Sequence, residues 1–209
     1  METMKLWQQV CTTDPAAVKK ITGKTYQGDS PKPYWLIQRA TEVFGPCGIG
    51  WGVNVVSERF ERITDTDVLH VAVVSIWFTQ DGKRSESIEQ MGGTKAAYMT
   101  SAGKMMIDED AGKKSVTDGM VKCLSMIGFA GDIFAGMWND SKYVEWAAEQ
   151  YHPKPDIAAI LRGISGSISV ELLRANFEVA MQMLDAAHHP AIKKATQARK
   201  AQLNSKATA

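Results

Sequence analysis

The stretch EDAGKKSVTDGMVKCLSMIGFAGD, residues 109–132, carries the strongest structural signal in the chain. Apolar side chains recur at spacings of three and four residues, which places them on one face of an α-helix: Val116, Met120, Cys123, Leu124 and Ile127. The acids at residues 108–110 lie at the positive N-terminal end of the helix dipole. Gly119 costs a helix about 1 kcal/mol relative to alanine, so we expect a neighbouring backbone or a ligand close to it.

The opposite side of this helix carries alternating charges. Lys114, Asp118 and Lys122 are spaced four residues apart, with the acid ahead of the second lysine in the order that stabilises a helix. A solvated helix face is the simplest interpretation of such a pattern.

Two segments before this helix, residues 49–60 and 68–79, are rich in β-branched and aromatic residues and are predicted to be strands. The second, VLHVAVVSIWFT, is apolar on both faces, so we expect helices, another sheet or a partner subunit to cover both sides. Asp81-Gly82 is a strong signal for a tight hairpin turn, and KRSESIEQM, residues 83–91, is predicted as the returning strand.

Helices are predicted on either side of these strands. Asp14 and Pro15 are typical of a helix start and favour a short helix through Lys20, and residues 34–44 form a second amphipathic pattern. Further helices are expected at residues 141–151 and 167–187. The last has apolar residues at near-heptad spacing, and packing on the rest of the protein or an oligomer contact would explain it.

This order predicts an α+β fold, with an antiparallel β-β-β-α core, N-terminal helices and a C-terminal helical extension. The sequence His152-Pro153-Lys154-Pro155 interrupts the chain. We therefore expect a core domain over residues 1–151 and a helical extension with a basic tail over residues 152–209.

Composition indicates a soluble cytoplasmic protein. The chain has 209 residues, a net charge of +1 and three cysteines, Cys11, Cys47 and Cys123, in no paired motif. Such cysteines favour a reducing compartment and argue against a zinc site. We find no signal-peptide pattern and no apolar run long enough to cross a membrane.

Motifs for covalent chemistry are incomplete. Gly23-Lys24-Thr25 ends like a phosphate-binding P-loop, but Val18 occupies the position of the first glycine. Residues 163–167, GISGS, lack the final glycine of a serine nucleophile elbow, and His188-His189 beside Pro190 is more typical of a helix end than of a metal site. We therefore expect no enzymatic activity, no cofactor and no metal.

Cationic and aromatic residues are instead interleaved near the N-terminus: Lys19, Lys20, Lys24, Tyr26, Lys32, Tyr34 and Trp35. Single-stranded nucleic acids are bound by this combination, because lysines pair with phosphates and aromatic rings stack on bases. Ordinary surface lysines and core aromatics are the alternative. Residues 189–209 carry further lysines and an arginine but no acid, as a polyanion-binding segment or a frayed terminus would.

Three segments occur in an order found in one known family: LIQRATEVFGPCGIGW at residues 36–51, HVAVVSIWFTQDGKRSESIEQMGG at 70–93, and the helix at 109–132. Together they resemble the annealing domain of the Rad-fifty-two family of double-strand-break repair proteins and its phage relatives of the Sak and Erf types. That family has a helix ending in NE-x-FG, a tryptophan-bearing strand, a hairpin with a DG turn and a helix of the form KxAVTDGLKRALRxFG. The matching residues here are Ala40 to Gly45, Trp51, Asp81-Gly82 and Lys113 to Met120. The resemblance covers residues 14–144 and leaves the C-terminal part without a counterpart.

The resemblance implies an oligomeric ring or filament that binds single-stranded DNA in a basic groove and anneals complementary strands without ATP, in recombination and repair. It implies DNA-binding roles for Lys113, Lys114 and Lys122 on the helix, and for Lys19, Lys20, Lys24, Tyr26 and Lys32 near the N-terminus. Val121 and Ser125 depart from the family, which has basic residues there. The small size suggests a phage or prophage protein in a bacterial host cell, with a phage exonuclease or a host single-strand binding protein as a further candidate partner.

Three alternatives remain at this level. A single-strand binding protein would protect DNA and slow annealing, and a metal-dependent enzyme would use the acids at residues 108–110. An interaction module would dock an acidic partner through its basic tail.

Overall fold

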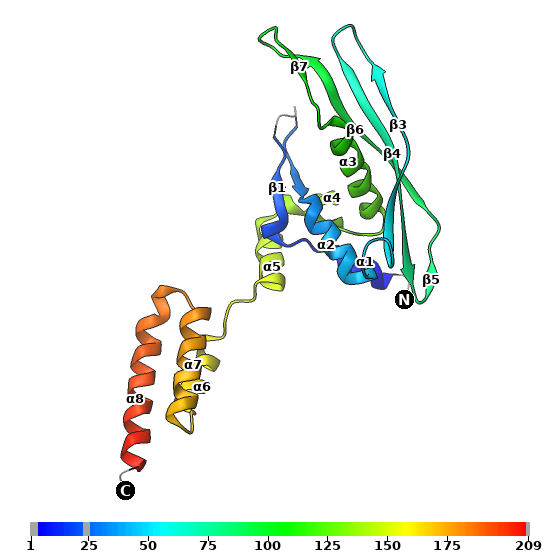
Figure 1. Cartoon of the computed structure of the whole chain (residues 1–209). Coiled ribbons are helices and arrows are strands. Elements are labelled where there is room, and N and C mark those ends of the chain that lie inside the picture. The colour runs from blue at the N-terminus through cyan, green and yellow to red at the C-terminus, as the bar shows by residue number, and fades with distance from the viewer. Residues whose placement is uncertain (1–3, 23–25, 208–209) are drawn as a thin grey trace. The chain divides into compact units, whose positions relative to one another are not determined.

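A computed structural model describes residues 4–22 and 26–207 and divides the chain into two compact units after Tyr151 (Figure 1). The predicted α+β class is confirmed, because an antiparallel sheet is followed by a long helix and a helical C-terminal part. We describe the N-terminal unit and the C-terminal unit separately. Within the described residues, no helix combines the length and apolar character needed to cross a membrane.

The main sheet of the N-terminal unit is antiparallel throughout, in the order β3-β4-β6-β7 (Figure 1). Its strands are β3 (Trp51–Arg62), β4 (Val68–Gln80), β6 (Ile88–Met99) and β7 (Met105–Ile107), and the short β5 (Lys83–Arg84) pairs with the end of β4. The two strands predicted before the helix are confirmed within two residues at each end. β7 was not predicted, because its three residues are too few to show a period.

Asp81-Gly82 forms the predicted turn, with φ angles of 51° and 75° that favour this residue pair. The strand that follows differs from the prediction. It is interrupted after Arg84, where the Ser85 hydroxyl accepts a hydrogen bond from the Phe78 amide, and it resumes at Ile88. Serine's competing hydroxyl explains the break, since it satisfies a backbone group that a continuous ladder would otherwise pair.

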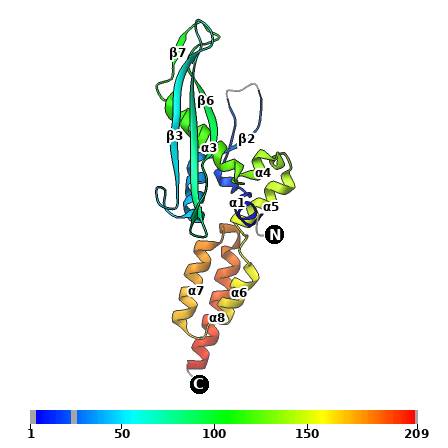
Figure 2. The ribbon, with the colours of Figure 1, turned by 90° about the vertical axis from the view of Figure 1, so that its right-hand side faces the viewer.

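Helix α3 (Ala111–Met126) lies across β4 and β6 on one face of the sheet (Figures 1 and 2). The contact is very close: a β-carbon at Gly92 would lie 1.9 Å from the Ser115 carbonyl oxygen, and one at Gly119 would lie 2.7 Å from Cγ2 of Val74. The expectation of a close neighbour at Gly119 is thus confirmed. Two facing glycines let the helix backbone rest on the strand backbone.

The core lies between α3, the sheet and α2 (Pro33–Phe44), whose predicted bounds are confirmed within one residue. Its largest fully buried side chains in this unit include those of Trp51, Phe129, Leu36, Ile76 and Leu124. α1 (Lys5–Val10), α4 (Gly131–Phe134), the short η3 (Met137–Asn139) and α5 (Ser141–Tyr151) complete the unit, and α5 has the bounds predicted for it. Among the described residues of this unit, we find no helix on the sheet face opposite α3, so cover by a partner there stays a prediction.

The predicted helix through Lys20 is wrong. A short 3-10 helix, η2 (Pro15–Ala17), ends at Ala17, and β1 (Val18–Lys20) then pairs with β2 (Asp29–Pro31) in a two-stranded hairpin. Asp14 caps η2 as expected by accepting from the Ala16 amide, but pairing with β2 replaces the helical hydrogen bonds beyond it.

A buried carboxylate anchors the N-terminal segment. Asp132 is 2% exposed and accepts hydrogen bonds from the Thr13 amide at 2.8 Å, the Thr13 hydroxyl at 2.6 Å and the Tyr143 hydroxyl at 3.0 Å. Because these donors come from segments far apart in sequence, Asp132 joins the segment before η2 to α5.

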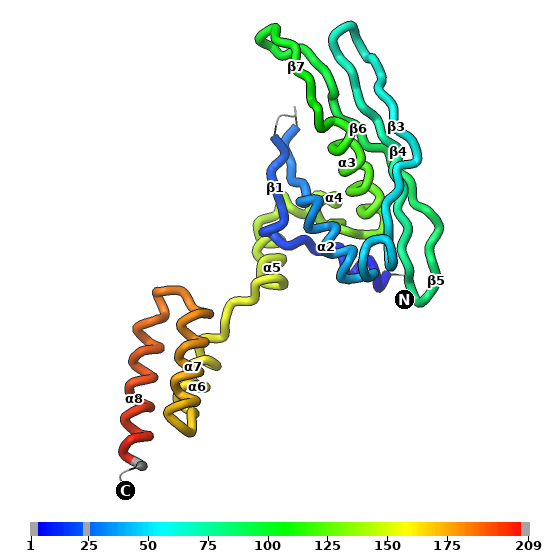
Figure 3. Tube along the Cα trace, viewed as in Figure 1, coloured from blue at the N-terminus to red at the C-terminus, as the bar shows by residue number. Residues whose placement is uncertain are grey.

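The C-terminal unit is a three-helix unit with its own core (Figure 3). It contains α6 (Ile157–Ser165), α7 (Val170–Met183), the short η4 (Ala186–His188) and α8 (His189–Ala207), with Ile164, Leu173, Ala180, Leu184 and Ile192 buried between them. Of the near-heptad residues, Leu173, Phe177, Ala180 and Leu184 pack in this core, whereas Val170 is 41% exposed. The helix predicted over residues 167–187 is shorter than expected, because Ser169 caps its start and the chain is extended at Leu184. α6 and α8 were not predicted, and His189 begins α8 rather than ending a helix.

Candidate nucleic-acid interface

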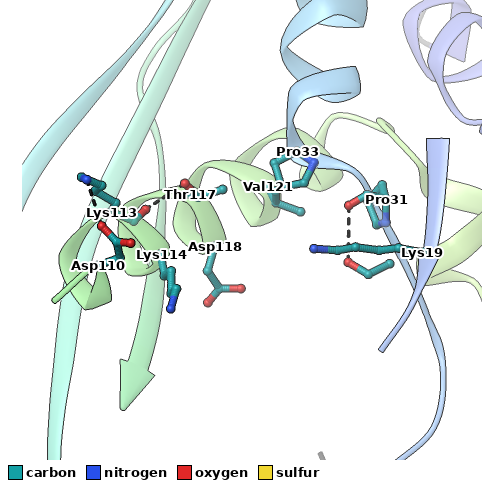
Figure 4. Close-up of a pocket in the computed structure, with 10 residues that line it drawn as sticks. Lys19, Pro31, Pro33, Asp110, Lys113, Lys114, Thr117, Asp118 and Val121 are labelled. Atoms are coloured by element: carbon teal, nitrogen blue, oxygen red, sulfur yellow. Dashed lines mark hydrogen bonds and ion pairs between the residues drawn. The ribbon is translucent and has the colours of Figure 1, made fainter. Parts of the chain in front are cut away.

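A pocket of about 480 Å³ lies between the β1–β2 hairpin, the start of α2 and the part of α3 before its last turn (Figure 4). Its lining contains three of the eight residues predicted for DNA binding, Lys19, Lys113 and Lys114. The other lining residues are Ser30, Pro31, Pro33, Asp110, Thr117, Asp118 and Val121. The lining is thus basic with two acids, and the fold brings together lysines that are more than ninety positions apart in the sequence.

The two helix lysines are held by acids at the start of α3. Lys113 donates to Asp110 at 2.9 Å, and Lys114 donates to Asp108 at 2.6 Å (Figure 4 shows the first pair). These hydrogen bonds, with the attraction of the acids, raise the pKa of both lysines, and the bond from Lys114 lowers the pKa of Asp108. Both amines stay cationic at neutral pH. Because both lysine side chains are more than half exposed, they can exchange a carboxylate for a phosphate at small cost.

Lys19 extends from β1 toward α3 across the pocket (Figure 4). Within the described residues it has no ion pair, unlike the two helix lysines. Its charge is therefore the least compensated in the pocket, and it faces the helix from the opposite wall.

Four other predicted residues lie outside this lining, and Lys24 falls outside the described residues. Lys20 pairs with Asp29 across the hairpin at 2.9 Å, and the Lys32 amine donates to the Ala16 carbonyl at 2.8 Å. Tyr26 is 59% exposed near the hairpin tip. Lys20 belongs to the β1–β2 hairpin that forms one wall of the pocket, and Lys32 directly follows this hairpin. The DNA-binding roles of Lys20, Tyr26 and Lys32 stay predictions.

Lys122 lies outside the pocket lining and bonds α3 to β6, and its DNA-binding role stays a prediction. Its amine donates to the Met91 carbonyl at 3.1 Å and to Asp118 at 2.8 Å, and Asp118 accepts from the Gly93 amide at 3.2 Å. The two side chains thus satisfy backbone groups on the free edge of β6. Two residues of the VTDG sequence at positions 116–119 thus hold α3 on the sheet. Asp118 bonds to β6, and Gly119 allows close packing on β4.

Aromatic surface is available beside the pocket. Tyr34 follows Pro33, a lining residue, and is 82% exposed, whereas Trp35 packs against Tyr151 with ring centroids 6.2 Å apart. Tyr34 therefore presents a ring that a base could stack on. The sequence predicted an amphipathic helix that begins at Tyr34, but it did not predict which of Tyr34 and Trp35 is exposed.

Hydroxyl and acid groups of the lining were not predicted. Thr117 and Ser30 contribute hydroxyls, and Asp110 and Asp118 contribute carboxylates that would repel a phosphate. The positions of Thr117 and Asp118 one turn after the helix lysines were the available signal. The acids limit the positive charge of one subunit, so a single pocket neutralises few phosphates.

No group of three or more histidine, cysteine, aspartate or glutamate side chains that could hold a metal ion occurs in the described part of the chain. The exposed lysines, hydroxyls and a neighbouring tyrosine can bind an anionic polymer through its phosphates and bases. Comparison of the chain with models of known protein families and with curated protein sequences finds no match.

Proposed function

We propose that this protein binds single-stranded DNA and anneals complementary strands without ATP, as a homo-oligomeric ring or filament acting in recombination and repair. The observation that carries the proposal is the convergence of Lys19, Lys113 and Lys114 on one pocket from two separate elements. The family resemblance of residues 14–144 supports it, and the β-β-β-α arrangement is compatible with it.

The proposed mechanism is physical. Lysines hold the phosphates of one strand, and Tyr34 or Tyr26 stacks on occasional bases while the other bases remain available for pairing. A complementary strand can then be tested along the bound strand. Duplex formation supplies the driving free energy, so this activity requires no covalent step.

Assembly is part of this proposal, because each pocket offers only a few cationic groups beside two acids. Weak sites gain useful affinity when several of them act on one strand at a high effective concentration. A single subunit should therefore bind and anneal poorly. A protein with this function would work in the cytoplasm, of a bacterial host if it is encoded by a phage, where an exonuclease or a host single-strand binding protein is a candidate partner.

The direct test mixes two complementary labelled oligonucleotides with and without the purified protein, in the absence of nucleotide and metal. Acceleration of duplex formation over the protein-free rate is expected. A protein that only protects single strands would slow pairing instead, and that result would reject annealing while leaving DNA binding intact. Unchanged pairing together with no binding would reject the proposal altogether.

A further inference from the structure

The strand edges of the main sheet differ in whether side chains cap their backbone groups. The free edge of β6 before β7 is capped, since Asp118 accepts from the Gly93 amide and Lys122 donates to the Met91 carbonyl. We find no such side-chain caps on the outer edges of β3 and β7 among the described residues of the N-terminal unit. Uncapped edges are templates for pairing with another chain.

Backbone groups of known position are available on β3. At its end the Ile63 amide donates to the Asp67 carbonyl, which makes this a hydrogen-bonded pair. Such pairs alternate along an antiparallel ladder, so the N–H and C=O groups of Glu58, Phe60 and Arg62 point away from β4.

The same reasoning applies to β7. The Thr100 amide donates to the Lys104 carbonyl and the Asp108 amide donates to the Ala96 carbonyl, one on each side of the β6–β7 ladder. By alternation, the N–H and C=O groups of Met105 and Ile107 point away from β6.

The side chains at these positions share one sheet face. Opposed residues of neighbouring strands point to the same face, and the pairs Arg62–Val68, Val68–Ala97 and Ala97–Ile107 link β3 to β7. The middle pair lies at a register shift between β4 and β6, so the pairing and not the count of residues along β6 fixes the face. Phe60 lies on this face too, two residues before Arg62. Phe60 is 67% exposed and Ile107 is 73% exposed, so each edge carries a large apolar side chain with little cover.

The number of strands makes the two edges complementary. Because β3, β4, β6 and β7 alternate in direction, β3 and β7 run in opposite directions. A second copy related by rotation about an axis along the strands therefore presents its β3 antiparallel to β7 of the first. The same rotation keeps the α3 face on the same side, so Phe60 of one copy meets Met105 or Ile107 of the next.

We propose that β7 of one copy pairs with β3 of the next copy, so that the sheet continues from subunit to subunit. The contact is heterologous, with different surfaces on the two sides, and it generates a ring or an open filament. This inference adds the subunit contact to the proposed function and relies on it only for the purpose of assembly. The contact itself can be tested without DNA.

The test measures particle mass by light scattering for the full chain and for two edge variants. Phe60→Pro removes an outward N–H of β3 and Ile107→Pro removes one of β7, and neither donor belongs to the internal ladder. Phe60→Leu and Ile107→Val are controls that keep the N–H groups and apolar side chains. Phe60→Lys and Ile107→Lys replace the proline variants if those fail to fold, because a charge also guards a strand edge.

We expect the wild type and controls to form large assemblies and each edge variant alone to be monomeric. An equimolar mixture of the two edge variants retains one intact β7 and one intact β3, so its mass should double to that of a mixed dimer. Wild-type-sized assemblies of either edge variant, or a monomeric wild type, would overturn the proposal. Dimers of Ile107→Pro alone would overturn it in favour of β3 pairing with β3.

These outcomes are separate from those of the annealing test. Assemblies that depend on both edges but do not anneal DNA would leave the contact standing and reject the proposed function. Annealing by assemblies whose mass is unchanged in both edge variants would support the proposed function and reject the contact.

Discussion

Replacing Gly119 by alanine should destabilise the N-terminal unit even though alanine is the better helix former. The new β-carbon would lie 2.7 Å from Cγ2 and 2.9 Å from Cβ of Val74, whereas carbon atoms in contact normally lie about 3.5–4.0 Å apart. Val74 is fully buried and branched at Cβ, so it cannot rotate away. Overpacking of this kind costs up to about 3 kcal/mol, and the helix gains up to about 1 kcal/mol, which leaves a net loss of about 2 kcal/mol.

Gly112 provides a matched control in the same helix. A β-carbon there meets no atom nearer than 3.9 Å, which is ordinary contact with the His70 ring. Gly112→Ala should therefore gain up to about 1 kcal/mol, so that the two alanine variants differ by about 3 kcal/mol in the free energy of unfolding.

Urea unfolding followed by tryptophan fluorescence measures this difference. All six tryptophans lie before His152, so the signal reports the N-terminal unit alone. If Gly119→Ala is as stable as Gly112→Ala, the close packing of α3 on β4 is not what requires this glycine, and the structural explanation of the VTDG motif fails.

Three further predictions concern other parts of the molecule. Burial and the nearby Asp132 raise the pKa of Tyr143. The stability that this shift contributes is therefore fully present below the unfolded pKa of about 10 and is lost as pH rises above it. Tyr143→Phe should reduce the fall of the unfolding free energy with rising alkaline pH, and an unchanged fall would exclude this phenol as its source. Lys122→Ala should lower stability by at most about 1 kcal/mol and change single-strand affinity less than twofold, whereas a larger loss of affinity would place Lys122 in the DNA site. Leu173→Ala should lower the free energy of unfolding of the C-terminal unit by about 2–5 kcal/mol. The unfolding transition seen by circular dichroism should shift, while the transition seen by tryptophan fluorescence stays in place. A shift of both transitions would show that the units unfold together.

Long periodic segments made most of the fold predictable from the sequence. The apolar stripe of α3, the strand-like runs of β3 and β4 and the helix α5 all appear where their patterns extend over several turns or pairs. In the N-terminal unit the errors lie in short elements. β1 has only three residues and its partner β2 is separated by a loop, so the local cap at Asp14 suggested a helix that tertiary pairing replaced.

The helices α6 and α8 of the C-terminal unit were not predicted for a different reason. α8 carries exposed lysines and few large apolar residues, so its sequence resembles a solvated tail. Its burial depends on single contacts such as Ile192 in the shared core and on the Arg199 guanidinium, which donates to the Ser167 carbonyl at 2.9 Å. Such contacts leave no periodic signal.

The candidate site was predictable in residue type but not in geometry. The sequence identified the lysines of β1 and α3, yet it could not show that Lys19 faces α3 while Lys122 turns to the edge of β6. Whether a surface lysine is free or engaged depends on neighbours from other elements, and the ion pairs of Lys20, Lys113 and Lys114 became visible only in the folded chain.

The central claim, that single-stranded DNA binds in the pocket between the β1–β2 hairpin and α3, is tested most directly by the salt dependence of binding in two triple variants of equal charge. One replaces the lining lysines Lys19, Lys113 and Lys114 by glutamine, and the other replaces Lys20, Lys32 and Lys122, which lie outside the lining. Each phosphate contact contributes about 0.7 to the slope of log affinity against log salt for single strands, so loss of three contacts should reduce the slope by about 2. The account predicts this reduction in the first variant and a slope close to wild type in the second. Equal reductions in both, or a larger one in the second, would contradict it.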